Sequence, residues 1–234
     1  MTTLRSACFV VIGAGGLGCP ALLALSAAGA RRAIVLDHDR VEVHNLQRQV
    51  LYDVGDVGAL KVEAAARRLP GLAIEPVRRR LMPSEVPAFV AGLPAAAVVL
   101  ECSDQPALKF AFNDACLAHG VPLVVGAALG WHGQALAVRP GAACYRCVYE
   151  APPPAELVPR CDEAGVIGSG VGHIGMLMAQ LALRLAEGDG TVAGQLWAID
   201  MLHARVQRLA PHLRAGCPAH RLAVARPSPL ASPP

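Results

Sequence analysis

The sequence is poor in aromatic and in charged side chains. Phenylalanine, tryptophan and tyrosine make up 4% of the 234 residues, so alanine, valine and leucine must build most of the hydrophobic core. Charged residues account for 17%, and the formal net charge is +3, which is too small to indicate a nucleic-acid-binding protein. Hydrophobic residues account for 54%, which is typical of one compact domain with a large core.

Charge is absent altogether between Cys8 and Ala30, which raises the question of a membrane span. Glycines and a proline interrupt this stretch, and no basic leader precedes it as in a signal peptide. A buried strand followed by a turn and a helix explains its apolar character better. We therefore expect a cytoplasmic protein that binds neither membrane nor nucleic acid. Its eight cysteines are then reduced, and clustered pairs indicate metal ligands rather than disulfides.

Strand and helix patterns alternate at short spacing, which predicts an α/β fold with a mostly parallel sheet. We expect strands at residues 7–12, 33–36, 73–77, 97–102, 122–128 and 134–138, with late antiparallel strands at 195–200 and 203–209. Expected helices cover residues 17–28, 59–69, 83–91, 105–119 and 168–187, and expected loops cover 41–57 and 144–160. The chain is predicted to form one domain over residues 1–222, followed by a disordered proline-rich tail over 223–234.

The most informative motif follows the first expected strand. This strand is separated from an alanine-rich helix by four glycines, namely Gly13, Gly15, Gly16 and Gly18. Asp37 then closes the next apolar run, which completes the order typical of a Rossmann-like nucleotide-binding unit. Glycines let the backbone approach a phosphate, and the helix start supplies free N–H groups. Asp37 is a candidate ligand for ribose hydroxyls, and Asp39, two residues further on, is a second candidate.

The motifs that follow this unit narrow the choice of nucleotide. They are Asn45-Leu46-Gln47-Arg48-Gln49, Gly58, Lys61, Cys102-Ser103-Asp104, Cys144-Tyr145-Arg146-Cys147, Cys161-Asp162-Glu163-Ala164-Gly165 and Cys217-Pro218-Ala219-His220. In this order, and with the glycine motif, they resemble the ThiF/MoeB/HesA family, the bacterial relatives of ubiquitin-activating enzymes. The resemblance runs from about Ser6 to about His220.

The resemblance implies an ATP-dependent adenylyltransferase that acts on the C-terminal glycine of a ubiquitin-like sulfur carrier ending in Gly-Gly. Such carriers serve the biosynthesis of thiamine or molybdopterin and similar pathways, in some cases with a separate sulfurtransferase. It further implies magnesium, a structural zinc and a homodimer. The family usually has an N-terminal arm whose arginine reaches the ATP of the partner subunit. Arg5 is the sole arginine before Gly13 and lies too close to the first strand for that role.

Adenylation joins two anions, so the site needs cations that stabilise the developing charge. Arg48 and Lys61 are the candidate phosphate ligands, because they lie downstream of the glycine motif; the alternative is two surface cations beside a loop. The resemblance makes Asp104 a magnesium ligand, whereas its alternative role is a helix N-cap. Asn45 and Gln47 either contact the nucleotide or hold the loop.

The spacing of Cys144 and Cys147 is typical of a zinc site, and Cys217 with His220 supplies a second pair. Three thiolates and one imidazole form an ordinary structural zinc set; the alternative is core cysteines and a surface histidine. Cys161 lies in the segment that the resemblance equates with the loop over the active site. In some relatives that cysteine takes the acyl group, which would make Cys161 a catalytic nucleophile here.

Two functions of other classes remain open at this point. An NAD-dependent oxidoreductase would explain the glycines and Asp37, but it gives Arg48, Lys61 and the cysteine pairs no coherent role. A non-catalytic module would bind the carrier without releasing pyrophosphate, having lost activity together with the N-terminal arginine arm.

Overall fold

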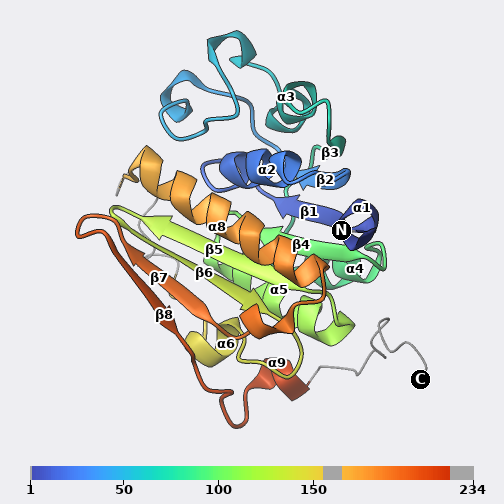
Figure 1. Cartoon of the computed structure of the whole chain (residues 1–234), viewed down its shortest axis with the longest axis vertical. Coiled ribbons are helices and arrows are strands. Elements are labelled where there is room, and N and C mark those ends of the chain that lie inside the picture. Colours follow the sequence, from blue (N-terminus) through green and yellow to red (C-terminus); the bar gives the residue numbers. More distant parts are fainter. Residues whose placement is uncertain (1, 155–164, 222–234) are drawn as a thin grey trace.

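One mixed β-sheet forms the centre of the molecule. The computed structural model describes residues 2–154 and 165–221. Within these residues the sheet has eight strands in the spatial order β3-β2-β1-β4-β5-β6-β7-β8 (Figure 1). The strands are β1 (Cys8–Ile12), β2 (Arg32–Leu36), β3 (Ala73–Val77), β4 (Ala97–Glu101), β5 (Leu123–Leu129), β6 (His132–Val138), β7 (Leu196–Asp200) and β8 (Arg205–Leu209).

The sheet has a parallel and an antiparallel half. β1 pairs in parallel with β2 and β4, β2 pairs with β3, and β4 pairs with β5. The strands from β5 to β8 follow one another in antiparallel pairs. The order of the parallel strands is that of dinucleotide-binding folds, in which ligands bind beyond the carboxyl ends of the strands. The expected α/β fold, with a mostly parallel sheet and late antiparallel strands, is confirmed.

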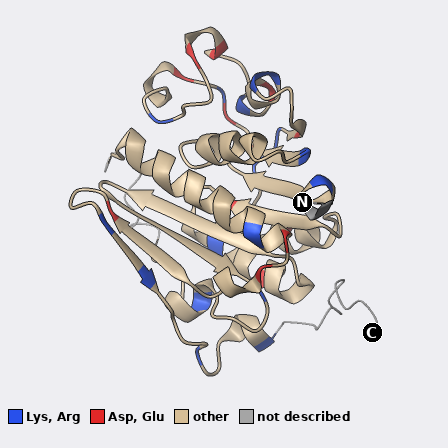
Figure 2. Ribbon diagram, in the orientation of Figure 1, with Lys and Arg blue, Asp and Glu red and all other residues tan. Residues whose placement is uncertain are grey.

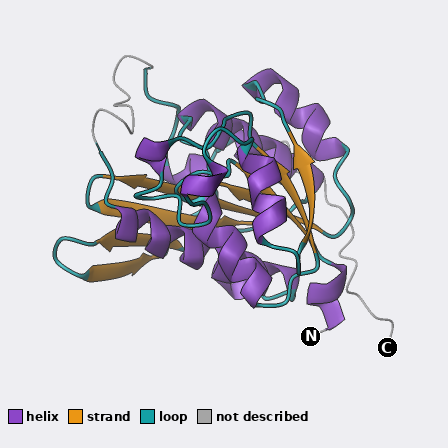
Figure 3. Ribbon diagram, turned by 90° about the horizontal axis from the view of Figure 1, so that it is seen from above, coloured by secondary structure: helices purple, strands orange, loops and turns teal. Residues whose placement is uncertain are grey.

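Helices cover both faces of this sheet (Figure 3). The α-helices are α1 (Thr2–Ser6), α2 (Gly18–Ala27), α3 (Lys61–Arg68), α4 (Val86–Ala91), α5 (Pro106–His119), α6 (Tyr145–Val148), α8 (Gly168–Ala186) and α9 (Pro218–Arg221). Short 3-10 helices are η1 (Val43–Asn45), η2 (Val54–Asp56), η3 (Pro83–Glu85) and η5 (Gly190–Val192). Phe9 and Val11 of β1 pack with residues of α2, α3 and α8, whereas Val10 packs with residues of α4 and α5. Because β1 is buried on both faces, it carries no polar residue.

Helix α8 lies unusually close to the sheet because two strand positions are glycines. A Cβ on Gly126 of β5 would collide with Met178, and one on Gly133 of β6 would collide with Ile174. Both of these α8 side chains are fully buried. Because of this close contact, α8 packs tightly on the sheet where its parallel half meets its antiparallel half.

Most expected elements end within two residues of those observed. Residues 83–91, expected as one helix, form η3 followed by α4. The expected loop over 144–160 was wrong at its start, because Cys144 caps the short helix α6, whose turn brings Cys147 back toward Cys144. The expected tail over residues 223–234 lies outside the described residues.

Charged side chains gather around the loops and the ends of the elements. In Figure 2, basic and acidic residues are interspersed there, and α8 carries a single charged residue, Arg184. Among the helices that the structure describes, we find none long and apolar enough to span a lipid bilayer.

Candidate functional site

The glycine motif begins where the carboxyl ends of β1, β2 and β4 meet. Gly13 follows β1 directly, has a φ of +91° and donates its N–H to the Leu36 carbonyl at 2.8 Å. A Cβ on Gly13 would lie 3.3 Å from the backbone of Cys102 and Ser103. A Cβ on Gly18 would collide with the carbonyl oxygen of Gly13. The turn therefore requires glycine at both positions, and it lies directly against the end of β4.

Asp37 comes directly after β2 and holds the glycine turn with its side chain. One carboxylate oxygen accepts the Ala14 N–H at 2.8 Å, and the other accepts the Asp39 N–H at 2.8 Å. An ionised carboxylate has about four acceptor sites, so about half of them remain available for hydroxyl donors. The role of Asp37 as a ribose ligand stays a prediction, and the side chain lies beside the turn as that role requires.

Lys61 lies at the start of α3 and is 5% exposed. Its Nζ donates to a carboxylate oxygen of Asp39 at 2.9 Å. Burial opposes ionisation of Asp39, but the hydrogen bond and the charge of Lys61 hold the pKa of that carboxyl below its usual range. The Tyr52 hydroxyl lies 2.9 Å from the carbonyl oxygen of Ala14 and 3.1 Å from that of Lys61. Lys61 and Asp39 are thereby joined to the glycine turn.

The loop between β2 and α3 carries Arg48, which is half-buried. Arg48 Nη2 donates to Asn45 Oδ1 at 2.9 Å, and Asn45 is itself buried. The Asn45 side chain therefore orients Arg48 within the loop, and a contact of Asn45 with the nucleotide stays a prediction. Gln47 is exposed, and its contact with a nucleotide stays a prediction.

One polar side chain of this loop was not singled out from the sequence. Gln49 is 3% exposed, and its Nε2 lies 3.7 Å from the position of a Cβ on Gly15. Among the residues that the structure describes, its Oε1 has no hydrogen-bond partner. The only signal in the sequence was its place at the end of the Asn45–Gln49 motif. Gln49 therefore joins the candidate nucleotide ligands, with one acceptor beside the glycine turn.

Asp104 is exposed in the turn that follows β4. Helix α5 has Gln105 as its N-cap and no side-chain cap, so the alternative role of Asp104 as that cap is not observed. Ligand atoms of Asp37, His38 and Asp39 lie within 4.8 Å of one another near the end of β2. Carboxylate oxygens at this edge suit magnesium, which prefers carboxylates together with phosphate oxygens.

A buried ion pair beside Asp104 was missed from the sequence. Glu101, the last residue of β4, is fully buried, and Lys109 of α5 is 3% exposed. Lys109 Nζ lies 2.5 Å from Glu101 Oε2. Burial raises the pKa of the Glu101 carboxyl, and the charge of Lys109 opposes that shift. The available signals were an acid that closes an apolar strand and a lysine within the apolar sequence of α5.

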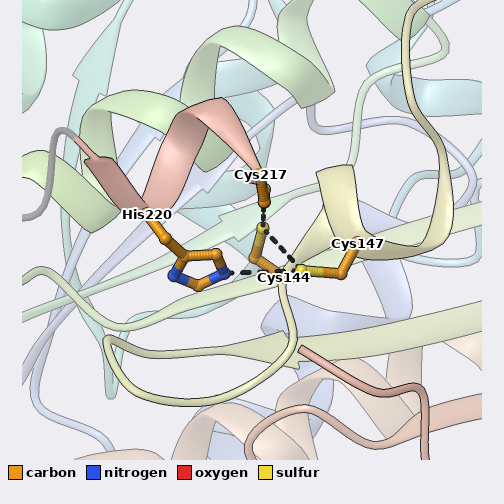
Figure 4. Close-up of side chains that lie close together, drawn as sticks. All are labelled: Cys144, Cys147, Cys217 and His220. Carbon is orange, nitrogen blue, oxygen red and sulfur yellow. Dashed lines mark hydrogen bonds between the residues drawn. The ribbon is translucent and has the colours of Figure 1, made fainter. Parts of the chain in front are cut away.

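The four predicted zinc ligands come together from two distant segments (Figure 4). Cys144 directly precedes α6, which contains Cys147, and Cys217 directly precedes α9, which contains His220. The ligand atoms of these four residues all lie within 4.8 Å of one another. Cys144 Sγ lies 3.7 Å from Cys147 Sγ and 3.8 Å from Cys217 Sγ, and Cys147 Sγ lies 3.5 Å from His220 Nε2. A tetrahedral zinc would place two sulfurs ~3.8 Å apart and a sulfur and a nitrogen ~3.6 Å apart. The observed spacing therefore fits zinc.

Neighbouring groups hold this cluster in place. Asn113 Nδ2 lies 3.7 Å from Cys144 Sγ, and the backbone N–H of Arg214 donates to Cys147 Sγ at 3.4 Å. Burial raises the pKa of Cys144 to about 12. Burial also opposes ionisation of Cys147, but the backbone N–H groups that face its sulfur hold its pKa below the usual value. Burial lowers the pKa of His220, which favours the neutral imidazole that a metal requires.

The predicted site residues thus form two separate groups. The glycine turn, Asp37, Asp39 and Lys61 are linked at the carboxyl edge of the parallel strands, and the cysteines with His220 form the other group. Cys161 lies outside the described residues.

The chain is similar to proteins of one known family. Residues 1–219 match the ThiF family. The chain is 38% identical over 220 residues to SAMP-activating enzyme E1 of Haloferax volcanii, covering 92% of this chain and 80% of that protein. It is 40% identical to adenylyltransferase and sulfurtransferase MOCS3 of Sus scrofa over 88% of this chain and 46% of that protein. It is also 40% identical to adenylyltransferase and sulfurtransferase uba4 of Aspergillus terreus, over 78% of this chain and 40% of that protein. The chain thus spans less than half the length of these last two relatives.

Solved structures show the same fold. A crystal structure of E. coli MccB with ATP has a TM-score of 0.79 and 18% sequence identity, and the match covers 94% of this chain and 68% of that one. A structure of PaaA has a TM-score of 0.70 and 16% identity, covering 89% of this chain and 65% of that one. The family match over nearly the whole chain, together with the Haloferax volcanii relative, identifies this protein as a member of the ThiF family.

Proposed function

We propose that this chain is an ATP-dependent adenylyltransferase that activates the C-terminal glycine carboxylate of a ubiquitin-like sulfur-carrier protein. The observation that carries the proposal is the match to SAMP-activating enzyme E1 over 80% of that protein's length. The linkage of Asp37, Asp39 and Lys61 to the glycine turn supports it, because these side chains lie at the edge where this fold binds ligands.

In the proposed reaction, an oxygen of the carrier's terminal carboxylate attacks the α-phosphorus of ATP. The bond from that phosphorus to the bridging oxygen breaks, and pyrophosphate leaves with the bond electrons. N–H groups of the glycine turn other than those of Gly13 and Ala14 face the phosphates, and Asp37 binds the ribose. Arg48 and Lys61 stabilise the charge that moves onto the leaving group. Asp104 would hold magnesium, which neutralises phosphate charge when bound.

A structural zinc is proposed for Cys144, Cys147, Cys217 and His220. The support is the sulfur spacing, which matches a tetrahedral site, and the four-ligand set, which leaves no open coordination position. Zinc would join the segment after β6 to the segment before α9. It takes no part in the chemical step.

The wider assignments are also proposals. We treat residues 1–222 as one adenylation domain that forms a cytoplasmic homodimer and delivers the activated carrier to a sulfurtransferase. Transfer of the acyl group to Cys161 stays a prediction. An NAD-dependent oxidoreductase finds no support in the comparisons.

The test is ATP–pyrophosphate exchange with magnesium and a panel of purified ubiquitin-fold carriers that end in Gly-Gly. We expect exchange with at least one carrier and none with the same carrier lacking its last glycine. Asp104→Asn should lower the rate by ~10²-fold, because one charge-stabilising group is lost. Glu187→Gln, which alters an exposed acid after α8, is the matched control and should retain the rate.

Two results would contradict the proposal. Carrier binding without exchange would favour the non-catalytic module. Exchange that persists at the full rate in Asp104→Asn would remove Asp104 from the magnesium site.

A further inference from the structure

The Lys109 side chain is anchored on three sides by oxygen atoms. Its Nζ lies 2.5 Å from Glu101 Oε2, 2.6 Å from the Ser103 carbonyl oxygen and 2.7 Å from the Gly126 carbonyl oxygen. An ammonium group has three N–H donors, so each donor has one acceptor and none is left for a substrate. Lys109 is therefore fully engaged within the protein, in contrast to Arg48, which is half-buried in a loop.

Glu101 binds the same turn through other atoms of Ser103. Its Oε1 accepts the backbone N–H of Ser103 at 3.1 Å and also the Ser103 hydroxyl. Ser103 is thus bound at its N–H and hydroxyl by Glu101 and at its carbonyl by Lys109. The ion pair fixes the backbone of one residue, the one immediately before Asp104.

The position of Ser103 connects the ion pair with the nucleotide site. A Cβ on Gly13 would lie 3.3 Å from Ser103 N, so the held residue packs directly against the glycine turn. Gly126 belongs to β5, the last strand of the parallel half. Lys109 therefore joins the turn after β4 to the middle of β5, beside the glycine turn where the phosphates are proposed to bind.

Stability alone does not account for such a pair. Desolvation of two charges cancels much of their attraction, and well-packed apolar residues of similar volume are often as stabilising. A buried pair does, however, fix geometry, because every donor and acceptor has one defined partner.

We propose that Glu101 and Lys109 are positioning residues that hold the Ser103–Asp104 turn against the glycine turn, so that Asp104 meets the metal and phosphates of the nucleotide. This proposal rests on the adenylation function proposed above. Neither residue contacts substrate. Loss of Lys109 releases the Ser103 and Gly126 carbonyls together, and a misplacement of ~1 Å costs about 10²-fold in rate.

The test compares Lys109→Met with Phe112→Leu in the full-length chain. Phe112 lies on the same helix and is fully buried, so its change weakens α5 packing without touching Ser103. Temperatures are chosen at which the two variants have equal free energies of unfolding. We then measure amide hydrogen exchange at Ser103 and Gln105. On the same variants we measure the kcat of pyrophosphate exchange and its dependence on magnesium.

We expect Lys109→Met to accelerate amide exchange at Ser103 and Gln105 more than tenfold relative to Phe112→Leu. We also expect kcat to fall ~10–100-fold, with a raised magnesium requirement and an unchanged KM for the carrier. Glu101→Gln, which retains an acceptor for Ser103, should have a smaller effect on both readouts. Equal behaviour of Lys109→Met and Phe112→Leu would overturn the proposal.

The two proposals fail in different ways. A wild-type chain that shows no pyrophosphate exchange with any carrier contradicts the adenylation function. In that case the amide exchange of Ser103 still decides whether Lys109 holds the turn, and the affinity for magnesium–ATP, measured by calorimetry, decides whether the turn serves a nucleotide. Unchanged amide exchange or unchanged affinity in Lys109→Met then overturns the positioning role.

Discussion

The nucleotide edge and the cysteine–histidine cluster differ in how far their functional atoms are already engaged. At the nucleotide edge, Asp104 and Gln47 are exposed and Asp37 keeps free acceptor sites. In the cluster, Cys144 and Cys217 are buried and all four ligand atoms face one another. An open coordination sphere suits a site that exchanges ligands, and a closed one suits a structural metal. The comparison indicates chemistry at the first site and stabilisation at the second.

Helix α5 contacts both regions. Lys109 holds the turn before Asp104, and Asn113, one helical turn further on, faces Cys144. Asn113 Oδ1 also accepts the Tyr145 N–H at 2.8 Å, and Arg146 forms hydrogen bonds with both oxygens of Asp114. The turn before Asp104 therefore contacts the first half of a helix whose middle contacts the cysteine–histidine cluster.

Breaking the cluster should have the largest effect. Cys217→Ser removes one thiolate ligand, so we expect loss of zinc and a decrease of more than ~4 kcal/mol in the free energy of unfolding. For a chain of this length that corresponds to a Tm decrease of ~8–16 °C. Metal content by mass spectrometry and thermal unfolding with and without chelator would check this.

Cys116→Ser is the matched control for that experiment, because Cys116 is equally buried but lies outside the cluster. It should keep one zinc per chain. A Cys217→Ser protein that retains zinc and its Tm would show that the four side chains form no metal site.

Altering the nucleotide edge should affect rate and leave stability nearly unchanged. Lys61→Met removes a cation proposed to bind phosphate, so we expect kcat to fall ~10²–10³-fold with zinc content retained. The cost to stability should be small, because Asp39, its partner, is half-exposed and remains solvated. Pyrophosphate exchange and metal analysis on the same preparation separate the two effects.

Arg40→Met supplies the control for Lys61. Arg40 is an exposed cation of the same region, and its Nη1 donates to the Gly58 carbonyl at 2.6 Å. Its removal should change kcat only a few-fold. Equal rates for Lys61→Met and Arg40→Met would mean that Lys61 only supports the fold.

The sequence predicted the fold and much of the two sites, for physical reasons that differ between them. Periodicity and glycine punctuation identified the eight strands and helices α2, α3, α5 and α8 to within two residues, and burial on both faces makes the parallel strands continuously apolar. Cys144 and His220 lie 76 positions apart, ligand chemistry together with the family resemblance paired them, and the structure brings them together. Motif spacing thus predicts which residues come together where a residue type has few alternative roles.

What the sequence did not show depends on tertiary packing. Glu101 and Lys109 are eight positions apart, on a strand and a helix, and only the fold reveals that both are buried and paired. The hydrogen bond between Asn45 and Arg48 is a second example, because only the geometry of the two side chains reveals it. Helix α6 was also missed, since its four residues are too few for a periodic signal.

The smallest expected effect concerns Asp56, a buried carboxylate in the loop that also carries Arg48. Asp56 is 5% exposed in the loop before α3 and accepts hydrogen bonds from Arg67 at 3.2 Å and Arg68 at 2.8 Å. Burial opposes ionisation, but the Asp53 N–H and the two arginines outweigh it and lower the pKa of Asp56. Because the folded state favours the charged form, this contribution is fully present above the ordinary pKa of ~3.9 and is lost as the pH falls through the lower folded value.

Asp56→Asn should therefore cost about 1–2 kcal/mol at pH 7, measured by urea unfolding. The difference from wild type should stay constant from pH 8 to pH 5 and shrink below about pH 4, because the unfolded wild-type chain then binds a proton at Asp56 that the folded state does not bind. Glu63→Gln, an exposed acid on α3, is the control and should change stability by less than ~0.5 kcal/mol. A difference that is independent of pH down to pH 3 would mean that shape, not charge, makes Asp56 important. Retained pyrophosphate exchange in Asp56→Asn would show that Asp56 stabilises the folded state and has no part in the proposed reaction.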